Sequence, residues 1–186
     1  MRGCTRLRND VEGSALLEFA LVVPLLVVFI VGIYDFSGAY IEKQKIGHAA
    51  QSGAITAVGQ PTGDRDNGNP DSLQPVVSVI FNSLAADGVL PLANQGSCTV
   101  PVTPSPPVGL SWTYKITNCP DDIIIIIDRG LVANGAVGTP DSVSTVVTVS
   151  YPYHWRFNSV IQLVAPGASY AAITDLRQSA TVHNQM

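Results

Sequence analysis

The sequence has little charge, little cysteine and few of the residue patterns that carry catalysis. Charged residues make up 13% of its 186 positions, and the formal net charge is -4. A nucleic-acid-binding surface needs clustered basic residues to neutralise phosphates, so nucleic acid is not an expected partner. The three histidines are scattered, and the sequence shows no Cys-x-x-Cys, Ser/His/Asp or phosphate-loop spacing. We therefore expect no enzyme, cofactor or metal site.

Much of the charge deficit lies in one apolar run near the N-terminus. Between Ala15 and Tyr34, 17 of 20 residues are apolar, and the exceptions are Glu18, Pro24 and Gly32. A helix of 20 residues is about 30 Å long, which matches the hydrocarbon core of a bilayer. Arginines precede the run, whereas the first lysines after it come well downstream: Arg2, Arg6, Arg8, Lys43 and Lys45. This asymmetry predicts a cytoplasmic N-terminus and an external remainder.

Glu18 is the feature of this run that needs an explanation, because a charge near the centre of a membrane helix costs roughly 2.5–3.5 kcal/mol. One interpretation is a secretory signal peptide, loosely cleaved at Ser37-Gly38-Ala39, although the apolar run is long for one. A second is a plain membrane anchor with Glu18 at headgroup level. The third starts from Gly13 and Glu18 together.

A short basic leader, Gly13 and a glutamate fifth after it resemble the cleavage site of type IV pilin-like proteins. More narrowly, "GSALLEFALVVPLL" resembles the TadE-like minor pilins of the tight-adherence (Flp) pilus system. Glu18 and Phe19 match the acidic-aromatic pair of that family, and Pro24 matches the proline at which its apolar helix bends. The resemblance covers about Gly13 to Ala57 and implies that a prepilin peptidase cuts after Gly13.

The spacing has a physical meaning. A cut after Gly13 frees the amine of Ser14 at a helix N-terminus, where the positive end of the macrodipole disfavours an ammonium group. Glu18, four residues on, lies on the same helix face and can neutralise that amine. Subunit pairing through Glu18 and Phe19 is what the resemblance implies, and the sequence leaves open whether the amine belongs to the same chain or to a neighbour.

The resemblance implies a minor pilin, or pseudopilin, with a structural role in the assembly or initiation of an adhesive Tad/Flp pilus. Its implied partners are the prepilin peptidase, the major Flp-type pilin, a sister minor pilin, the inner-membrane assembly platform and membrane lipid. The implied location is the bacterial inner membrane, with a periplasmic C-terminal domain, and the pilus or cell surface beyond it. The alternative is an uncleaved, membrane-anchored extracytoplasmic module that binds or senses a ligand.

The expected organisation is a leader over 1–13, a transmembrane helix over 14–34, its continuation over 35–59 and a periplasmic α+β domain over 60–186. Small residues recur at three- and four-residue spacing after Tyr34, and we expect this stripe to pack on the chain's own domain rather than on neighbouring helices. The connector from Gly59 to Asp71 faintly resembles a calcium loop, but a solvated turn fits better. A second short helix is expected from Ser72 to Asp87, with Asp71 as its cap.

The remainder alternates like an antiparallel sheet of about four strands beneath the long helix. The expected strands are Leu110 to Thr117, Ile123 to Ile127, Val143 to Tyr153 and Asp175 to His183, with "PSPPVG" and "NGAVGTPD" as loops and Asn158 to Ala165 as a short apolar segment. The five consecutive isoleucines predict a strand buried on both faces, or alternatively a patch that inserts into a membrane or partner.

Cysteine pairing follows from the predicted topology. Cys98 and Cys119 would lie on the oxidising side of the membrane, whereas Cys4 would lie on the reducing side. They are therefore the expected disulfide, worth roughly 3 kcal/mol for a loop of about twenty residues in the chain-entropy model. Two buried free thiols are the alternative.

Overall fold

The computed structural model describes residues 11–64, 67–101, 103–133, 142–157 and 173–184. In chain order its elements are α1 (Val11–Val58), η1 (Asp71–Leu73), α2 (Gln74–Ala86), α3 (Leu92–Gln95), β1 (Ser105–Val108), β2 (Ser111–Ile116), β3 (Ile123–Ala133), β4 (Ser142–His154) and β5 (Ile173–His183). The chain divides into two compact units. The first contains described residues 11–37 and 155–157, and the second contains described residues 38–154 and 173–184.

Helix α1 is continuous from Val11 to Val58, with Pro24 inside it. The end of the helix at Val58 confirms the predicted end near Gly59. The backbone hydrogen bonds from Gly59 N to Thr56 O and from Gln60 N to Ala57 O close the last turn. The long apolar helix, a second short helix and an antiparallel sheet confirm the predicted α+β fold.

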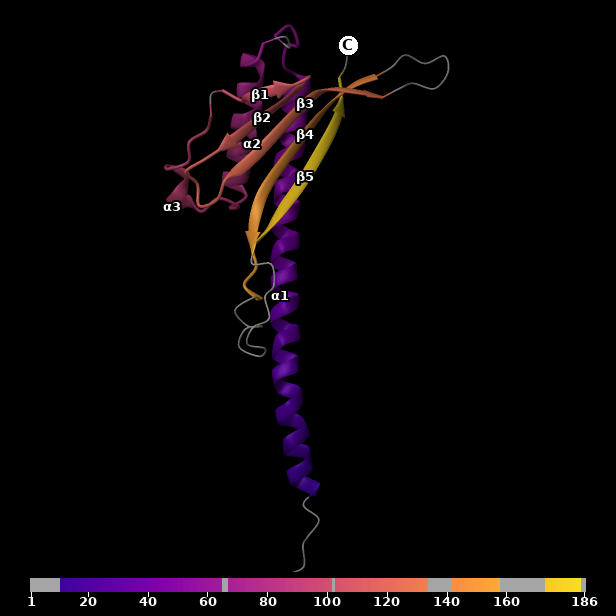
Figure 1. Cartoon of the computed structure of the whole chain (residues 1–186). Helices are drawn as coiled ribbons and strands as arrows, with labels where there is room; N and C mark the ends of the chain where they lie inside the picture. The colour runs from indigo at the N-terminus through magenta and orange to yellow at the C-terminus, as the bar shows by residue number, and fades with distance from the viewer. Residues whose placement is uncertain (1–10, 65–66, 102, 134–141, 158–172, 185–186) are drawn as a thin grey trace, which may run out of the picture. The chain divides into compact units, whose positions relative to one another are not determined.

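The second unit is a sheet with helices on one face. The five strands lie in the order β1-β2-β3-β4-β5, and every neighbouring pair is antiparallel. Helix α2 and the C-terminal part of α1 lie against the same face of this sheet (Figure 1). The expected number of strands was about four, and the additional one is β1.

Strand β1 corrects the prediction that "PSPPVG" is a loop. Ser105–Val108 pairs with β2 in an irregular register, and all four of its side chains are exposed. Two consecutive prolines argue against a central strand because they donate no ladder hydrogen bonds. At the edge of a sheet one side of the strand has no partner strand, so the missing donors of Pro106 and Pro107 are tolerated there.

The core lies between the sheet and the two helices. The small residues of α1 that we expected to pack on the chain's own domain are buried there, as are the apolar residues of the second helix. This outcome confirms the prediction that the small residues of α1 pack on the chain's own domain. Fully buried members of the cluster include Ile46, Ala49, Ala50, Ala54, Leu73, Val76, Val77, Ile80, Leu84, Trp112, Tyr114 and Ile116.

The five isoleucines form a central strand, but their predicted burial on both faces is wrong. Ile123, Ile125 and Ile127 are fully buried on the face that the helices cover. Ile124 is 38% exposed, and Ile126 is only partly buried. The prediction failed because it assumed a second covering layer, and none of the described residues forms one on that face.

The start of α2 also differs from the prediction. A 3-10 turn, η1, precedes the helix, and Asp71 does not cap it through its side chain. The acceptor comes instead from the connector: Asp64 Oδ2 accepts the backbone N–H of Ser72 at 3.0 Å, and Asp64 Oδ1 accepts the Ser72 hydroxyl at 2.9 Å. The helix ends as expected before Gly88, whose φ of 69° suits a residue without a Cβ.

Strands β4 and β5 confirm the remaining predicted strands. They pair along the whole of β5, from His154 opposite Ile173 to Ser144 opposite His183. At Pro152, β4 has only β5 as a neighbour, because pairing with β3 ends at Ser150. The predicted loop over 134–141 and the predicted apolar segment over 158–165 lie outside the described residues.

Candidate processing and membrane-anchoring site

The predicted processing site lies at the start of α1. Ser14 and Glu18 are one turn apart, and both are exposed. The Ser14 hydroxyl lies 3.4 Å from Glu18 Oε1, at the long end of the hydrogen-bond range. This contact places residue 14 and the Glu18 carboxylate on one face of the helix, as the i, i+4 spacing predicts. Gly13 precedes them within α1.

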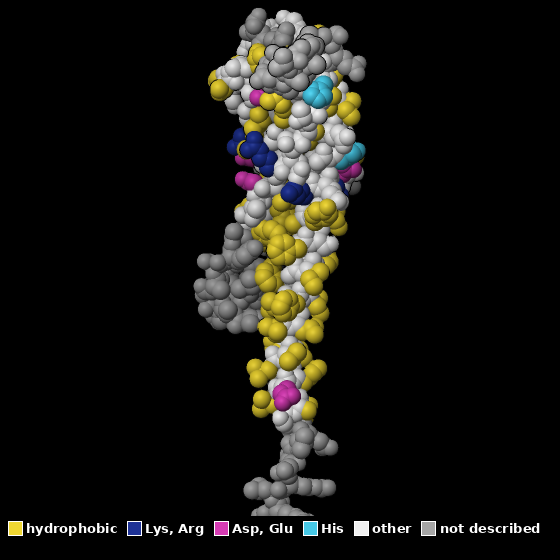
Figure 2. Space-filling view, turned by 90° about the vertical axis from the view of Figure 1, so that its right-hand side faces the viewer, with side chains coloured by type: hydrophobic (Ala, Val, Ile, Leu, Met, Phe, Trp, Pro, Cys, Tyr) yellow, Lys and Arg dark blue, Asp and Glu magenta, His cyan; other side chains and the backbone are white. Residues whose placement is uncertain are grey.

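Phe19 and the residues that follow present an apolar surface. The side chain of Phe19 is 67% exposed, and Pro24 lies within the same exposed stretch. Figure 2 shows hydrophobic side chains gathered along this N-terminal part of α1. Such exposure is unfavourable in water for a contiguous patch, and it is the normal state of a helix surrounded by lipid. The exposed large side chains include Leu16, Leu17, Leu21, Leu25, Leu26, Phe29, Ile30 and Ile33.

By length and composition, α1 is able to cross a membrane. The only helix of this kind among the described residues lies within Ser14–Val58, and its most apolar window has no buried residues in the structure. A core helix of a soluble protein would be mostly buried over such a window. The apolar helix is therefore compatible with a membrane anchor.

The family comparison falls on this same segment. Residues 13–54 match the family described as "TadE-like protein". Over this segment the chain is similar to that family, and residues 13–54 are called the TadE-like segment below. The TadE-like segment begins at the proposed cut, contains Glu18, Phe19 and Pro24, and ends among the small residues of α1 that are buried in the core. No curated protein and no solved structure matches the chain.

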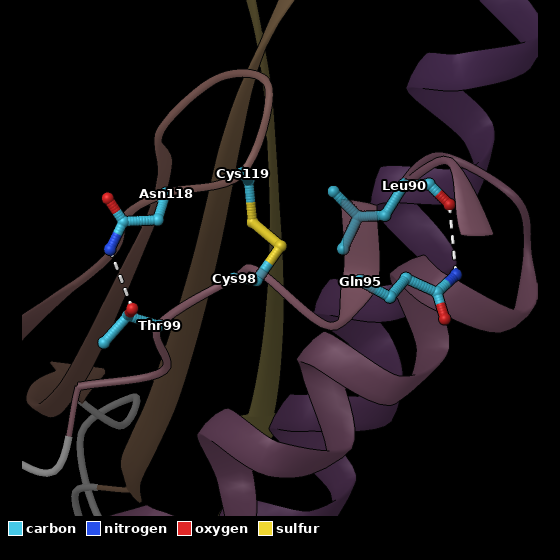
Figure 3. The surroundings of a disulfide bond; sticks show 6 residues. All are labelled: Leu90, Gln95, Cys98, Thr99, Asn118 and Cys119. Carbon is cyan, nitrogen blue, oxygen red and sulfur yellow. Dashed lines mark hydrogen bonds between the residues drawn. A yellow bond between two sulfur atoms is a disulfide. The ribbon is translucent and has the colours of Figure 1, made fainter. Parts of the chain in front are cut away.

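The expected disulfide between Cys98 and Cys119 is present in the second unit (Figure 3). It closes a short ladder in which Thr99 and Thr117 exchange both backbone hydrogen bonds, at 2.7 and 3.2 Å. Asn118 adopts a φ of 62°, which asparagine tolerates better than most residues, and its side chain donates to Thr99 Oγ1 at 2.8 Å. The bond ties the segment after α3 to the end of β2.

A buried arginine that the sequence pattern did not single out joins three parts of the second unit. Arg129 is 1% exposed and donates to the carbonyls of Ala57 and Pro61 at 3.0 and 3.2 Å, and to the Ser72 hydroxyl at 3.0 Å. A cation at the C-terminal end of α1 also interacts favourably with the helix dipole. The sequence did contain this information. Arg129 follows Ile125 and Ile127 at every second position of β3, and all three side chains are buried.

Asp64 completes this cluster. Burial alone would raise the pKa of Asp64, but the hydrogen bonds from the Ser72 N–H and hydroxyl and the charge of Arg129 outweigh that effect and lower it. Asp64 is therefore a structural acceptor for the start of η1. The described residues contain no group of His, Cys, Asp and Glu side chains able to hold a metal.

A buried carboxylate, Asp35, lies at the end of the apolar run and was not among the predicted site residues. Asp35 is only 2% exposed, and its Oδ2 accepts the backbone N–H of Phe157 at 2.8 Å. Its neighbour Phe36 meets Trp155 edge to face, with ring centroids 5.1 Å apart. The sequence signal was a carboxylate directly after an apolar run. Its partner, 122 residues away, could not be read from local pattern.

Proposed function

We propose that this chain is a minor pilin, or pseudopilin, with a structural role in the assembly or initiation of a Tad/Flp adhesive pilus. In this proposal a prepilin peptidase cuts between Gly13 and Ser14, and α1 holds the mature chain in the inner membrane. The sheet and α2 then lie in the periplasm. The TadE-like match implies association with a pilus system, and the proposal adds the processing step and the role.

One observation carries the proposal: Ser14 and Glu18 share a face of an exposed apolar helix within the TadE-like segment. After a cut, the new amine is on the residue whose hydroxyl already lies within reach of the Glu18 carboxylate. Pairing an ammonium with a carboxylate lowers the cost of holding both in a region of low dielectric. The same pairing made with the amine of a neighbouring subunit would set the axial position of one helix against the next.

The proposed partners are those of an assembly component rather than of an enzyme. They are the prepilin peptidase, the major Flp-type pilin, a sister minor pilin, the assembly platform and membrane lipid. Nucleic acid is not among them, since the chain is acidic overall.

The decisive measurement is the N-terminal residue of the chain recovered from membranes of its own cell type, by mass spectrometry. The proposal predicts Ser14. A Gly13→Ala variant should retain Met1, whereas Gly32→Ala, a matched glycine within the same helix, should be processed normally. A wild-type chain that begins at Met1 contradicts processing, and one that begins at Tyr40 indicates a signal peptide.

Glu18→Ala separates processing from assembly. We expect this variant to begin at Ser14 but to be lost from assembled complexes, because the carboxylate acts after the cut. Glu42→Ala serves as the control, since it removes a glutamate from α1 beyond the apolar run. Normal assembly of Glu18→Ala would contradict the pairing and leave the cleavage proposal standing.

The second candidate function is an uncleaved, membrane-anchored binding module, and the open face of the sheet favours it. A depression of about 340 Å³ on this face is lined by Ile124, Ile126, Thr148, Ser150, Asp175 and Arg177. Apolar side chains with an acid and a base beside them suit recognition of another protein or a small ligand. A mature chain that begins at Met1 would favour this function.

A further inference from the structure

The segment that follows β4 returns to α1 at the end of the apolar run. Within the first unit, Trp155 and Phe157 contact α1 over residues 32–36. The N–H of Phe157 donates to Asp35, and the ring of Trp155 packs edge to face on Phe36. The Phe157 ring also faces Gly32, where a Cβ would lie 3.7 Å from Cε2. Three different kinds of contact therefore fix the same short segment.

The hydrogen bond to Asp35 fixes where Trp155 and Phe157 lie along α1. A carboxylate that is 2% exposed beside an apolar surface is costly unless donors satisfy it. The Phe157 N–H supplies one at 2.8 Å, a length typical of a charge-assisted bond. A purely apolar contact could slide along α1 by a turn, whereas this bond sets the height of Trp155 and Phe157 on the helix.

That height coincides with the end of the lipid-compatible surface. Ile33, Tyr34 and Phe36 are still exposed, at 70%, 69% and 59%. Trp155 is partly buried and Arg156 is exposed. Tryptophan and tyrosine are enriched at the boundary between headgroups and acyl chains, and arginine extends its charge from there toward water.

From Phe19 to Tyr34 the surface of α1 carries no charged side chain. A depression of about 450 Å³ lies beside α1, lined by Val28, Phe29, Gly32, Ile33, Phe36 and Phe157. No charged side chain is among these lining residues. Because the depression is continuous with the exposed apolar surface of the helix, the medium that surrounds the helix would also fill it. In a bilayer that medium is phospholipid acyl chain.

We propose that Trp155, Arg156 and Phe157 form a second contact with the membrane, at the end of the α1 span, and that a phospholipid acyl chain occupies the depression beneath Phe157. Trp155 and Arg156 lie at headgroup level, and Asp35 holds them there. This inference rests on the proposed function in one respect: α1 must lie in a bilayer. It adds a membrane contact from a part of the chain more than one hundred residues after the anchor.

Tryptophan fluorescence tests the proposal on the full chain in vesicles of phosphatidylcholine and phosphatidylglycerol. The chain contains two tryptophans, and Trp112 is fully buried in the core of the second unit. Phospholipids brominated near the headgroup should quench the emission of Trp155. Phospholipids brominated deep in the acyl chain should quench it much less. Trp155→Phe should lose this quenched emission entirely while keeping the emission of Trp112.

Substitutions of Asp35 and of two control residues test whether the hydrogen bond to Asp35 holds Trp155 in place. In Asp35→Leu the acceptor of the Phe157 N–H is lost, so we expect most of the quenching by shallow bromine to disappear and iodide in the water to quench Trp155 instead. Asp175→Leu removes an exposed carboxylate from β5 and should leave the quenching unchanged. Gly32→Ala should also leave it unchanged, because the added Cβ makes only ordinary contact with Phe157.

Flotation of the same vesicles distinguishes failure of the membrane anchor from failure of the second membrane contact. A chain that does not float with the lipid overturns both the anchor and this inference. A chain that floats while iodide alone quenches Trp155 overturns the inference and leaves the anchor standing. A chain that floats with Trp155 shielded from both iodide and brominated lipid shows that protein, such as a second copy, covers this surface, and it also overturns the inference.

Discussion

Gly53 allows α1 and α2 to approach each other closely. A Cβ at this position would lie 2.5 Å from Ile80 Cγ1 and 2.6 Å from Ile80 Cδ1, too close for any real contact. Gly47, on the same helix, has room: its Cβ would meet only the Gln178 side chain, at 3.8 Å. The requirement for glycine is therefore steric at one position and absent at the other.

We expect Gly53→Ala to lower the free energy of unfolding by about 1–3 kcal/mol, because overpacking forces the helices apart. Gly47→Ala should raise it by up to about 1 kcal/mol, since alanine favours a helix interior. Urea unfolding of the detergent-solubilised chain measures both. Equal shifts in the two variants would mean that α1 and α2 are not in close contact at Gly53.

The cluster of Asp64, Ser72 and Arg129 predicts a pH dependence of stability. The pKa of Asp64 in the folded chain lies below its ordinary value of 3.8. A lowered pKa stabilises the folded state above the unfolded pKa, and this stabilisation is lost as the pH falls through the folded pKa. The carboxylate therefore contributes fully near neutral pH and least in strong acid.

We expect Asp64→Asn to be less stable than wild type at pH 7, with the difference shrinking as the pH falls below about 3.8. Ser72→Ala removes one of the hydrogen bonds that lower the pKa of Asp64. Adding Asp64→Asn to Ser72→Ala should therefore change the free energy of unfolding less than Asp64→Asn does alone. Unfolding free energies at several pH values measure both effects. A difference in stability between wild type and Asp64→Asn that stays constant with pH would contradict the role of the ionised carboxylate.

Strand β3 shows what alternation along a sequence can and cannot predict. The sequence predicted a central strand correctly, because five isoleucines favour extended backbone and demand burial. Which face is covered depends on how many layers the rest of the chain supplies, and that is not a local property. The helices of the second unit cover one face, so the parity of the residue decides its burial: Ile125 is buried and Ile124 is partly exposed.

Alanine substitutions on β3 test this assignment. Ile125→Ala should cost about 2–5 kcal/mol of unfolding free energy, because it leaves a cavity in the core. Ile124→Ala, its immediate neighbour, should cost less than about 1 kcal/mol, since it removes a partly exposed side chain. The two variants have the same composition and the same strand, so propensity cancels. Similar losses in both would show that a second layer covers the open face.

The predictions for β1 and for the start of α2 were wrong for the same reason: both features depend on residues that are distant in the sequence. The prolines of β1 argued for a loop, yet one-sided pairing with β2 makes an edge strand possible. Asp71 stood at the expected cap position, but Asp64, seven residues earlier, provides the acceptor. By contrast, the motif from Gly13 to Pro24 depends on local spacing alone, and the family match recovers that segment.

At the scale of the whole molecule, α1 belongs to two environments. Its N-terminal part is exposed and apolar, whereas its C-terminal part contributes Ile46, Ala49, Ala50, Ala54 and Ala57 to the core beneath the sheet. The second unit begins at Gly38 and so contains all of these core residues. The helix is therefore both the anchor candidate and an integral part of the α+β fold.

Two truncated chains separate these roles. A chain that begins at Gly38 keeps every core residue of α1 and loses the exposed apolar stretch, so we expect it to fold in water without detergent. A chain that begins at Gly59 lacks those residues and exposes the apolar face of the sheet, so we expect it to aggregate or to lack cooperative unfolding. Urea unfolding monitored by Trp112 emission distinguishes them, because Trp112 lies in that core. Cooperative unfolding of the Gly59 chain would show that α1 is dispensable to the fold and serves only as an anchor.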